Sequence, residues 1–179
     1  DPAGVVDSTL NALRIADAMA ARSGLQCRKI NLGGGFGIAH GSEWRELDLA
    51  QVAAQLNPLL RAWRAQSAAH QDCALLYELG RFFTAPAGVY VTQVVGVKSS
   101  RGKHFVTCDG GLNHHLAAAG TFGAALRGNF PVLNLSRPDA PAAVCTLSGA
   151  SCNPTDLLGV DVTLPRPEPG DLVGVAMSG

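Results

Sequence analysis

Three consecutive glycines, Gly33, Gly34 and Gly35, follow an apolar run that ends at Leu32. Glycine has no Cβ atom, so the backbone there can bend sharply and direct several N–H groups at one anion. A phosphate is the anion expected for such a loop at the end of a strand. A plain turn is the alternative, because clusters of glycine also serve that purpose.

Two charged residues, Glu78 and Arg81, follow the next apolar run. Arg81 can add a charge-assisted, forked contact to the same phosphate. Glu78 would repel a phosphate unless it faces a cation, such as the protonated nitrogen of an aromatic ring. Pyridoxal phosphate carries both a phosphate and a pyridine nitrogen, and a carboxylate paired to that nitrogen makes the ring an electron sink. The alternative is a salt bridge between Glu78 and Arg81 at a barrel rim.

A third group lies near the end of the chain, where Cys152 and Asp156 occupy a loop between two expected strands. A thiol in such a loop can donate a proton, or it can be an inert, buried, small hydrophobic residue. His114 and His115 are adjacent, so they face different ways in regular structure and are not expected to share a metal ion. The sequence therefore predicts no metal site.

The composition narrows the class of protein. Of 179 residues, 47% are hydrophobic, which is enough for a sizeable core, and 14 basic residues balance 14 acidic ones. Without a basic block, nucleic acid is not an expected partner, and the apolar runs are too short to cross a bilayer. Five widely spaced cysteines without a CxxC pattern, and a chain start without a signal peptide, fit the cytoplasm. Both chain ends are expected to be cut from a longer protein.

Helical and strand-like patterns alternate in the first half of the chain. Apolar residues recur at helical spacing over 6–20, and an apolar strand is predicted over 25–32. A second helix is predicted over 48–63, kinked or split at Pro58, and a third buried run follows over 73–77. This order predicts a parallel α/β layout, in which chemistry lies at the carboxyl ends of the strands. The glycines and the Glu78 motif both fall at such ends.

From about residue 88 the pattern changes to short β-branched runs separated by Gly and Pro. This pattern predicts a mostly antiparallel β-domain, so the expected division is 1–87 and 88–179. Residues 118–140 are expected to form a long loop with a short helix. The expected strands lie at 89–97, 104–108, 142–147, 159–164 and 171–176.

These motifs, taken in order, resemble the fold-type III pyridoxal-phosphate decarboxylases, a family that includes the diaminopimelate, ornithine and arginine decarboxylases. Leu79 stands where the family's Glu-Pro-Gly-Arg motif has proline, and the details look most like a bacterial subgroup found near exosortase and exopolysaccharide genes. The matching segments are 31–38, 78–81, 97–98 with 105–111, 149–156, and the Leu-Pro and Gly-Asp pairs at 164–165 and 170–171.

The resemblance implies the C-terminal part of a (β/α)8, alanine-racemase-like barrel over 1–87, followed by a β-domain over 88–179. It also implies a homodimer whose active site is shared across the interface, acting on a small amino-acid substrate. By the same resemblance the three glycines hold the cofactor phosphate, Glu78 pairs with the pyridine nitrogen and Arg81 supports the phosphate.

In the β-domain, the resemblance assigns Cys152 to the neighbouring subunit's active site, where it is linked to protonation after decarboxylation. Asn153 and Asp156 would bind substrate. Diaminopimelate and ornithine enzymes carry an acidic residue after the cysteine for the distal ammonium, and this chain has Asn153 there. A neutral or carrier-linked amino acid is therefore expected instead of a free diamino acid.

The family's Schiff-base lysine comes from an early barrel strand. None of the chain's three lysines, Lys29, Lys98 and Lys103, has that context. We therefore expect a C-terminal fragment of an amino-acid decarboxylase that is inactive alone. Three alternatives stay open: a non-catalytic homologue that binds or regulates, a racemase on the same scaffold, and a generic phosphate-binding α/β module.

Overall fold

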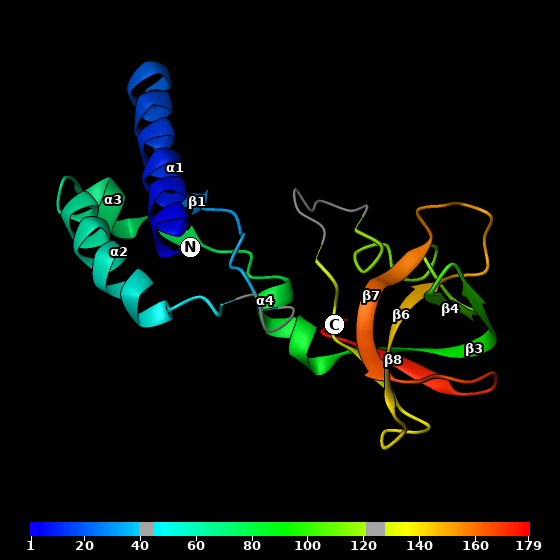
Figure 1. Ribbon diagram of the computed structural model, residues 1–179. Helices are drawn as coiled ribbons and strands as arrows, with labels where there is room; N and C mark the ends of the chain where they lie inside the picture. The colour runs from blue at the N-terminus through cyan, green and yellow to red at the C-terminus, as the bar shows by residue number, and fades with distance from the viewer. Residues whose placement is uncertain (40–44, 121–127) are drawn as a thin grey trace. The chain divides into compact units, whose positions relative to one another are not determined.

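The computed structural model describes residues 1–39, 45–120 and 128–179, and its chain folds into two compact units (Figure 1). The first unit comprises Asp1–Ile38 and Arg45–Phe82, and the second contains Phe83–Gly179. In the described residues no helix has the length and apolar character that crossing a membrane requires.

The first unit is a pair of parallel strands flanked by helices. Strands β1 and β2 pair in parallel, with Ile30 opposite Leu75. Its elements are α1 (Pro2–Ser23), β1 (Lys29–Asn31), α2 (Leu49–Arg64), α3 (Ala68–Asp72), β2 (Ala74–Leu76) and α4 (Arg81–Thr84), whose last residues enter the second unit.

Helix α1 has clear signals at both ends. The Asp1 side chain caps the first turn by accepting a hydrogen bond from the Ala3 N–H, and Gly24 ends the helix in the left-handed conformation with φ of 72°. The buried face includes Leu13, which packs with Ile30 of β1 in one core cluster. The predicted helix over 6–20 is confirmed.

Helix α2 begins where predicted, because the Asp48 side chain accepts a hydrogen bond from the Gln51 N–H at 2.9 Å. Val52 and Trp63 are buried along its inner face. The helix is continuous through Pro58, so of the predicted kink or split there, the split is wrong and the kink stays a prediction. A proline inside a helix removes one backbone donor, and the turns on both sides remain helical.

The strands of this unit are shorter than the apolar runs suggest. The predicted strand over 25–32 is reduced to the three residues Lys29–Asn31, and Leu25 is 74% exposed. The third apolar run, predicted over 73–77, likewise yields the three residues Ala74–Leu76. A strand extends only as far as a neighbour pairs with it, and the β1–β2 ladder is three residues long.

The second unit is a six-stranded sheet in the order β5-β8-β3-β4-β6-β7. Every neighbouring pair is antiparallel except β4 and β6, which confirms the predicted mostly antiparallel domain. A short 3-10 turn, Ala85–Ala87, precedes the sheet. Its strands are β3 (Val89–Ser100), β4 (Lys103–Cys108), β5 (Val132–Asn134), β6 (Ala142–Ser148), β7 (Leu157–Pro165) and β8 (Leu172–Ala176).

The predicted long loop over 118–140 is interrupted by a strand, and the part of the prediction that falls on 121–127 lies outside the described residues. Residues 118–120 and 128–140 contain strand β5 and no helix. The Asn129 side chain exchanges two hydrogen bonds with the Val160 backbone, at 2.8 and 3.0 Å. These bonds join the segment before β5 to β7, which is the far end of the strand order. The sheet is therefore curled until it nearly closes.

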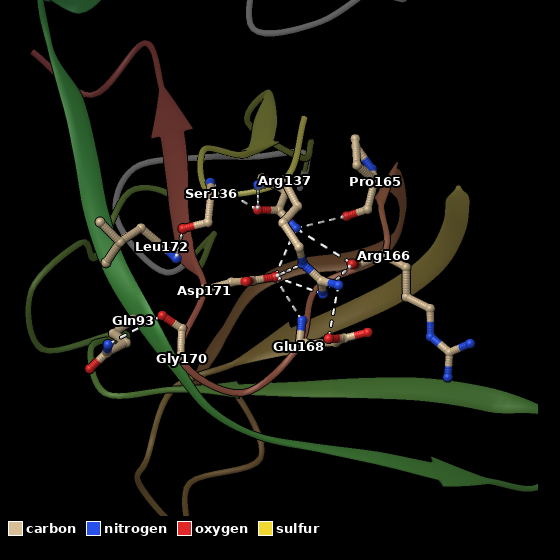
Figure 2. Close-up of polar contacts among 10 residues, drawn as sticks. Gln93, Ser136, Arg137, Pro165, Arg166, Glu168, Gly170, Asp171 and Leu172 are labelled. Carbon is tan, nitrogen blue, oxygen red and sulfur yellow. Dashed lines mark hydrogen bonds and ion pairs between the residues drawn. The ribbon is translucent and has the colours of Figure 1, made fainter. Parts of the chain in front are cut away.

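The core of this sheet is apolar and tightly enclosed, with Leu147, Leu158 and Val173 fully buried. One buried polar cluster ties β5 to the loop before β8 (Figure 2). The Asp171 carboxylate accepts hydrogen bonds from the Asn134 side chain at 3.1 Å and the Arg137 Nε at 3.0 Å. The backbone N–H of Glu168 donates to the same oxygen at 2.8 Å.

The electrostatics of Asp171 follow from these contacts. Burial raises the pKa of this carboxyl, but hydrogen bonds from the Glu168 N–H, Arg137 and Asn134 outweigh burial and lower it below its usual range. Asp171 is part of the Gly-Asp pair recognised in the sequence, and this network gives that pair a structural role.

Candidate cofactor-binding site

The carboxyl ends of β1 and β2 lie side by side. The pairing continues past both strands, because the Leu32 N–H donates to the Leu76 carbonyl at 2.8 Å and the Glu78 N–H donates to the Gly33 carbonyl at 2.8 Å. The glycine-rich loop and the Glu78 motif therefore meet at one edge, as predicted from the order of elements.

Backbone geometry explains why glycines occupy this loop. Gly33 and Gly35 have φ of 79° and 84°, in the left-handed region that disfavours other residues. A Cβ atom at Gly34 would collide with the backbone carbonyl of Glu78. The close approach of the two loops thus requires a bare backbone at Gly34.

The loop presents donors to solvent. The Gly33 N–H is used within the loop, where it donates to the Asn31 Oδ1 at 2.8 Å. The N–H groups of Gly34 and Gly35 make no hydrogen bond to any described residue, and both residues are exposed. Two adjacent backbone donors are therefore free to bind an anion such as phosphate.

The Asn31 side chain connects the two motifs. Its Oδ1 holds the glycine loop, and its Nδ2 donates to Oε1 of Glu78 at 2.5 Å. The motif places Asn31 at the start of the loop but indicates no role for its side chain. The signal for it was its position, as the last residue of a strand directly before glycines.

Glu78 and Arg81 do not pair with each other. No ion pair joins them in the described part of the chain, and both residues are exposed. The alternative of a Glu78–Arg81 salt bridge is therefore wrong. Phe36 contacts Tyr77 edge-on at a ring distance of 5.3 Å, which packs the far side of the glycine loop against the end of β2. The two charged side chains stay open to a ligand.

In the second unit, Cys152 lies in the loop between β6 and β7 as an exposed free thiol. The alternative of a buried, inert cysteine at this position is therefore wrong. Cys108 and Cys145 are buried in the sheet core instead, and burial raises the pKa of the Cys108 thiol to about 11. A protonated thiol in a dry core is inert, so Cys152 is the exposed thiol of this sheet domain.

The buried Asp156 carboxylate holds the Cys152 loop in place through hydrogen bonds to the backbone. Its side chain is buried, with 2% of the residue exposed, and Oδ1 accepts a hydrogen bond from the Leu112 N–H at 2.6 Å. Oδ2 accepts from the Ser151 N–H at 3.1 Å. Burial raises the pKa of this carboxyl, and the hydrogen bonds from Leu112 and Ser151 lower it further than burial raises it. This geometry favours a positioning role, and the substrate contact of Asp156 stays a prediction.

Asn153 follows Cys152 and is exposed. Its Oδ1 accepts hydrogen bonds from the Thr155 N–H at 3.0 Å and from the Thr155 hydroxyl at 2.9 Å. Its own N–H donates to the Ser151 hydroxyl at 3.3 Å. The amide oxygen thus shapes the loop, while the Asn153 Nδ2 is left to contact a ligand.

The two adjacent histidines differ in their polar contacts, although both rings contact Tyr90, His115 edge-on. His115 Nδ1 accepts a hydrogen bond from the Ala118 N–H at 3.2 Å, which leaves the proton on Nε2, 2.7 Å from the Ser178 hydroxyl. Burial lowers the pKa of His115. His114 instead stacks on Tyr90. The described residues contain no group of three side chains that could hold a metal ion.

A helix-flanked pair of parallel strands with two polar loops at one edge, followed by a nearly closed sheet, defines an α/β-plus-β protein. The family model described as "Pyridoxal-dependent decarboxylase, C-terminal sheet domain" matches residues 5–179. The chain therefore belongs to this family, which confirms the resemblance seen in the motifs.

The curated relatives of the chain support its assignment to this family. The chain is 36% identical over 180 residues to the L-glutamyl-(BtrI acyl-carrier protein) decarboxylase of Niallia circulans, covering 98% of the chain and 41% of that protein. It is 30% identical over 174 residues to the diaminopimelate decarboxylase of Vibrio cholerae, covering 97% of the chain and 38% of that protein. The chain thus spans about two fifths of the length of these relatives.

Solved structures share the fold. Diaminopimelate decarboxylase from Helicobacter pylori in complex with L-lysine gives a TM-score of 0.76 at 24% identity, over 100% of this chain and 41% of that one. The enzyme from M. jannaschii, also in complex with L-lysine, gives 0.80 at 21% identity, over 100% and 39%.

Proposed function

We propose that the full-length protein is a pyridoxal-phosphate-dependent amino-acid decarboxylase. Residues 1–87 would form the C-terminal part of its (β/α)8 barrel, and residues 88–179 its β-domain. The proposal includes a cytoplasmic homodimer with an active site shared across the interface. Family membership and the decarboxylase relatives support it.

One observation carries the proposal: the Gly34 backbone and the Glu78 carboxylate lie at adjacent strand ends, coupled through Asn31. The free N–H groups of the glycine loop would bind the cofactor phosphate, with Arg81 adding a cation. When bound, pyridoxal phosphate supplies an electron sink for the electrons that remain after carbon dioxide leaves.

The chain's own residues would do three further things. Glu78, held by the Asn31 amide, keeps a proton on the ring nitrogen by pairing with it. Cys152 donates its thiol proton to the carbon that has lost its carboxylate and is reprotonated from solvent. Asp156 keeps the Cys152 loop in shape through its two backbone contacts.

The substrate class follows from Asn153. A neutral amide beside Cys152 gives no charge to a distal ammonium, so a free diamino acid is disfavoured. The Niallia circulans relative is named for a glutamyl group on a carrier protein. We infer a neutral or carrier-linked amino acid as the substrate, with the Asn153 Nδ2 as a donor to it.

The test uses the full-length protein. Cofactor uptake should give an absorbance band at roughly 420 nm, and carbon dioxide should be released from glutamyl carrier protein. Glu78→Gln should lower kcat about 10- to 100-fold, since a hydrogen bond to a charged group contributes about 1.5–3 kcal/mol. No cofactor uptake, or turnover that Glu78→Gln leaves unchanged, would overturn the proposal. Loss of optical activity without carbon dioxide release would indicate a racemase.

A further inference from the structure

Cations gather at one end of the second unit, around the β3–β4 hairpin. A hollow of about 730 Å³ is lined by Lys103, His104 and Arg166, and a neighbouring one of about 470 Å³ by Lys98, Arg101 and Lys103. A third, of about 60 Å³, includes Lys98, His104 and Arg166. The three hollows share lining residues in pairs around one end of the hairpin, where Lys98 and Lys103 lie on one face of the strands and His104 on the other. We call this end the basic hollow and define it by Lys98, Arg101, Lys103, His104 and Arg166.

The fold explains this gathering. Ser100 pairs with Lys103 across the hairpin, and the two residues between them, Arg101 and Gly102, have φ of 52° and 76°. A two-residue turn with both φ values positive matches the twist of the strands and projects its first side chain outward. Parallel pairing of β4 with β6 then brings in the end of β7, where Arg166 follows the strand.

The charge of the basic hollow is largely uncompensated. Lys103 pairs with Asp161 at 3.1 Å, but Lys98, Arg101 and Arg166 form no ion pair with any residue the structure describes. Asp161 is the acidic residue in the lining. Three unpaired cations therefore lie together on a chain whose total charge is zero.

Apolar side chains complete this surface. Val144 lines the first hollow and Val97 lines the third, and these residues are 52% and 46% exposed. Exposed branched side chains among unpaired cations suit a protein surface, where apolar contact and charge complementarity act together. A nucleic acid would use the cations alone, through its phosphates.

We propose that the basic hollow docks the acidic surface of a carrier protein that presents the amino acid. The inference rests on the proposed function, within which it names the partner. Strand β4, whose six residues span about 17 Å at about 3.4 Å per residue, leads from the hollow to the turn that contains Leu112, and the Leu112 N–H donates to Asp156 of the Cys152 loop. The carried amino acid would bridge that span on its linker.

Direct binding tests the inference without measuring turnover. The full-length protein is titrated with the BtrI acyl-carrier protein of the Niallia circulans relative as the probe, in about 20 mM and about 300 mM salt. Binding should weaken at least tenfold at the higher salt. The double variant Lys98→Glu/Arg101→Glu should weaken it at least tenfold at low salt and remove most of the salt dependence. Arg22→Glu, a reversal of an exposed cation on α1, is the matched control and should bind like the parent protein.

Thermal unfolding of each variant first shows that it is folded. Absence of binding to the probe, or binding that the double variant retains, overturns the docking inference. So does equal or tighter binding of a DNA duplex of roughly 30 bp, about the length of a protein–DNA site, or of anionic vesicles, with the same dependence on Lys98 and Arg101. Failure of the proposed function looks different: carrier protein binds, but no carbon dioxide is released from it.

Kinetics give a second readout. The double variant should raise KM at least tenfold for glutamyl carrier protein with kcat unchanged, and should leave turnover of a small glutamyl thioester as in the parent protein. Equal loss on both substrates would contradict docking at this surface.

Discussion

Asn31 donates a hydrogen bond to Glu78 at 2.5 Å across the parallel pair of β1 and β2, and its other side-chain atom holds the Gly33 N–H at 2.8 Å. One amide therefore links a carboxylate to the glycine loop. Gly33 and Glu78 are 45 positions apart in the sequence, and helix α2 lies between them. The parallel pairing of β1 and β2 brings the two motifs together.

The first prediction concerns that amide. Asn31→Ala should weaken cofactor affinity of the full-length protein about tenfold, because a side-chain hydrogen bond to a charged group contributes about 1.5–3 kcal/mol. Asn31→Asp should weaken it further, since it places a second carboxylate against Glu78. Cofactor titration followed by absorbance checks both. An Asn31→Asp variant that binds as tightly as Asn31→Ala would contradict the role of Asn31 as a donor.

The second prediction concerns the glycine loop. Gly34→Ala would drive a methyl group into the Glu78 carbonyl and should cost about 1–3 kcal/mol of unfolding free energy, the usual range for forced overpacking. Gly37→Ala is the matched control, because nothing lies near its added Cβ and its φ is not positive. Chemical denaturation measures both. Equal stability of the two variants would contradict the close approach of the loops.

The third prediction separates two cysteines. Cys152→Ala should change the unfolding free energy by less than about 0.5 kcal/mol, as is usual for an exposed side chain, and should lower kcat about 100-fold by removing a proton donor. Cys108→Ala should instead cost about 1 kcal/mol of stability, since it removes buried packing volume. Unfolding and turnover are measured on both full-length variants, and unchanged turnover in Cys152→Ala would exclude the thiol as the donor.

The fourth prediction is a pH dependence. The native pKa of Asp156 lies below its value in the unfolded chain, because its hydrogen bonds outweigh the opposing effect of burial. Its contribution to stability is therefore complete above about pH 4, the ordinary pKa of Asp, and is lost as pH falls through the native pKa. Asp156→Asn should cost about 1–3 kcal/mol at neutral pH and flatten the fall in stability below about pH 4.

The matched control for that variant is Asp139→Asn, because Asp139 is exposed on the same unit. It should leave both the stability at neutral pH and its acid dependence within about 0.5 kcal/mol of the parent protein. Denaturant titrations over a pH series provide the comparison. An acid profile of Asp156→Asn identical to that of Asp139→Asn would contradict the buried carboxylate network.

Much of the fold was predictable because the local signals are strong. The end of α1 at Gly24 and the cap of α2 at Asp48 each follow from one residue with a special backbone or side-chain property. Strand β3 follows from a run of β-branched residues. The meeting of the glycines with Glu78 followed from topology, because parallel strands place their carboxyl ends together.

The remainder depends on long-range pairing that local patterns do not encode. Strand β5 is three residues long and exists because β8 pairs with it. The predicted strand over 25–32 shrank because a partner pairs with only three of its residues. The link from Asn31 to Glu78 was missed because an asparagine before glycines is a common turn residue, and its partner is far away in the chain.

The central claim is that the Gly34 loop and Glu78 bind opposite ends of one cofactor molecule. The most direct measurement is a crystal structure of the full-length protein with pyridoxal phosphate bound. Phosphate oxygens should lie within hydrogen-bonding distance of the Gly34 and Gly35 N–H groups, and the pyridine nitrogen should lie against the Glu78 carboxylate. A phosphate bound away from these N–H groups, or a ring nitrogen that faces another residue, would contradict it.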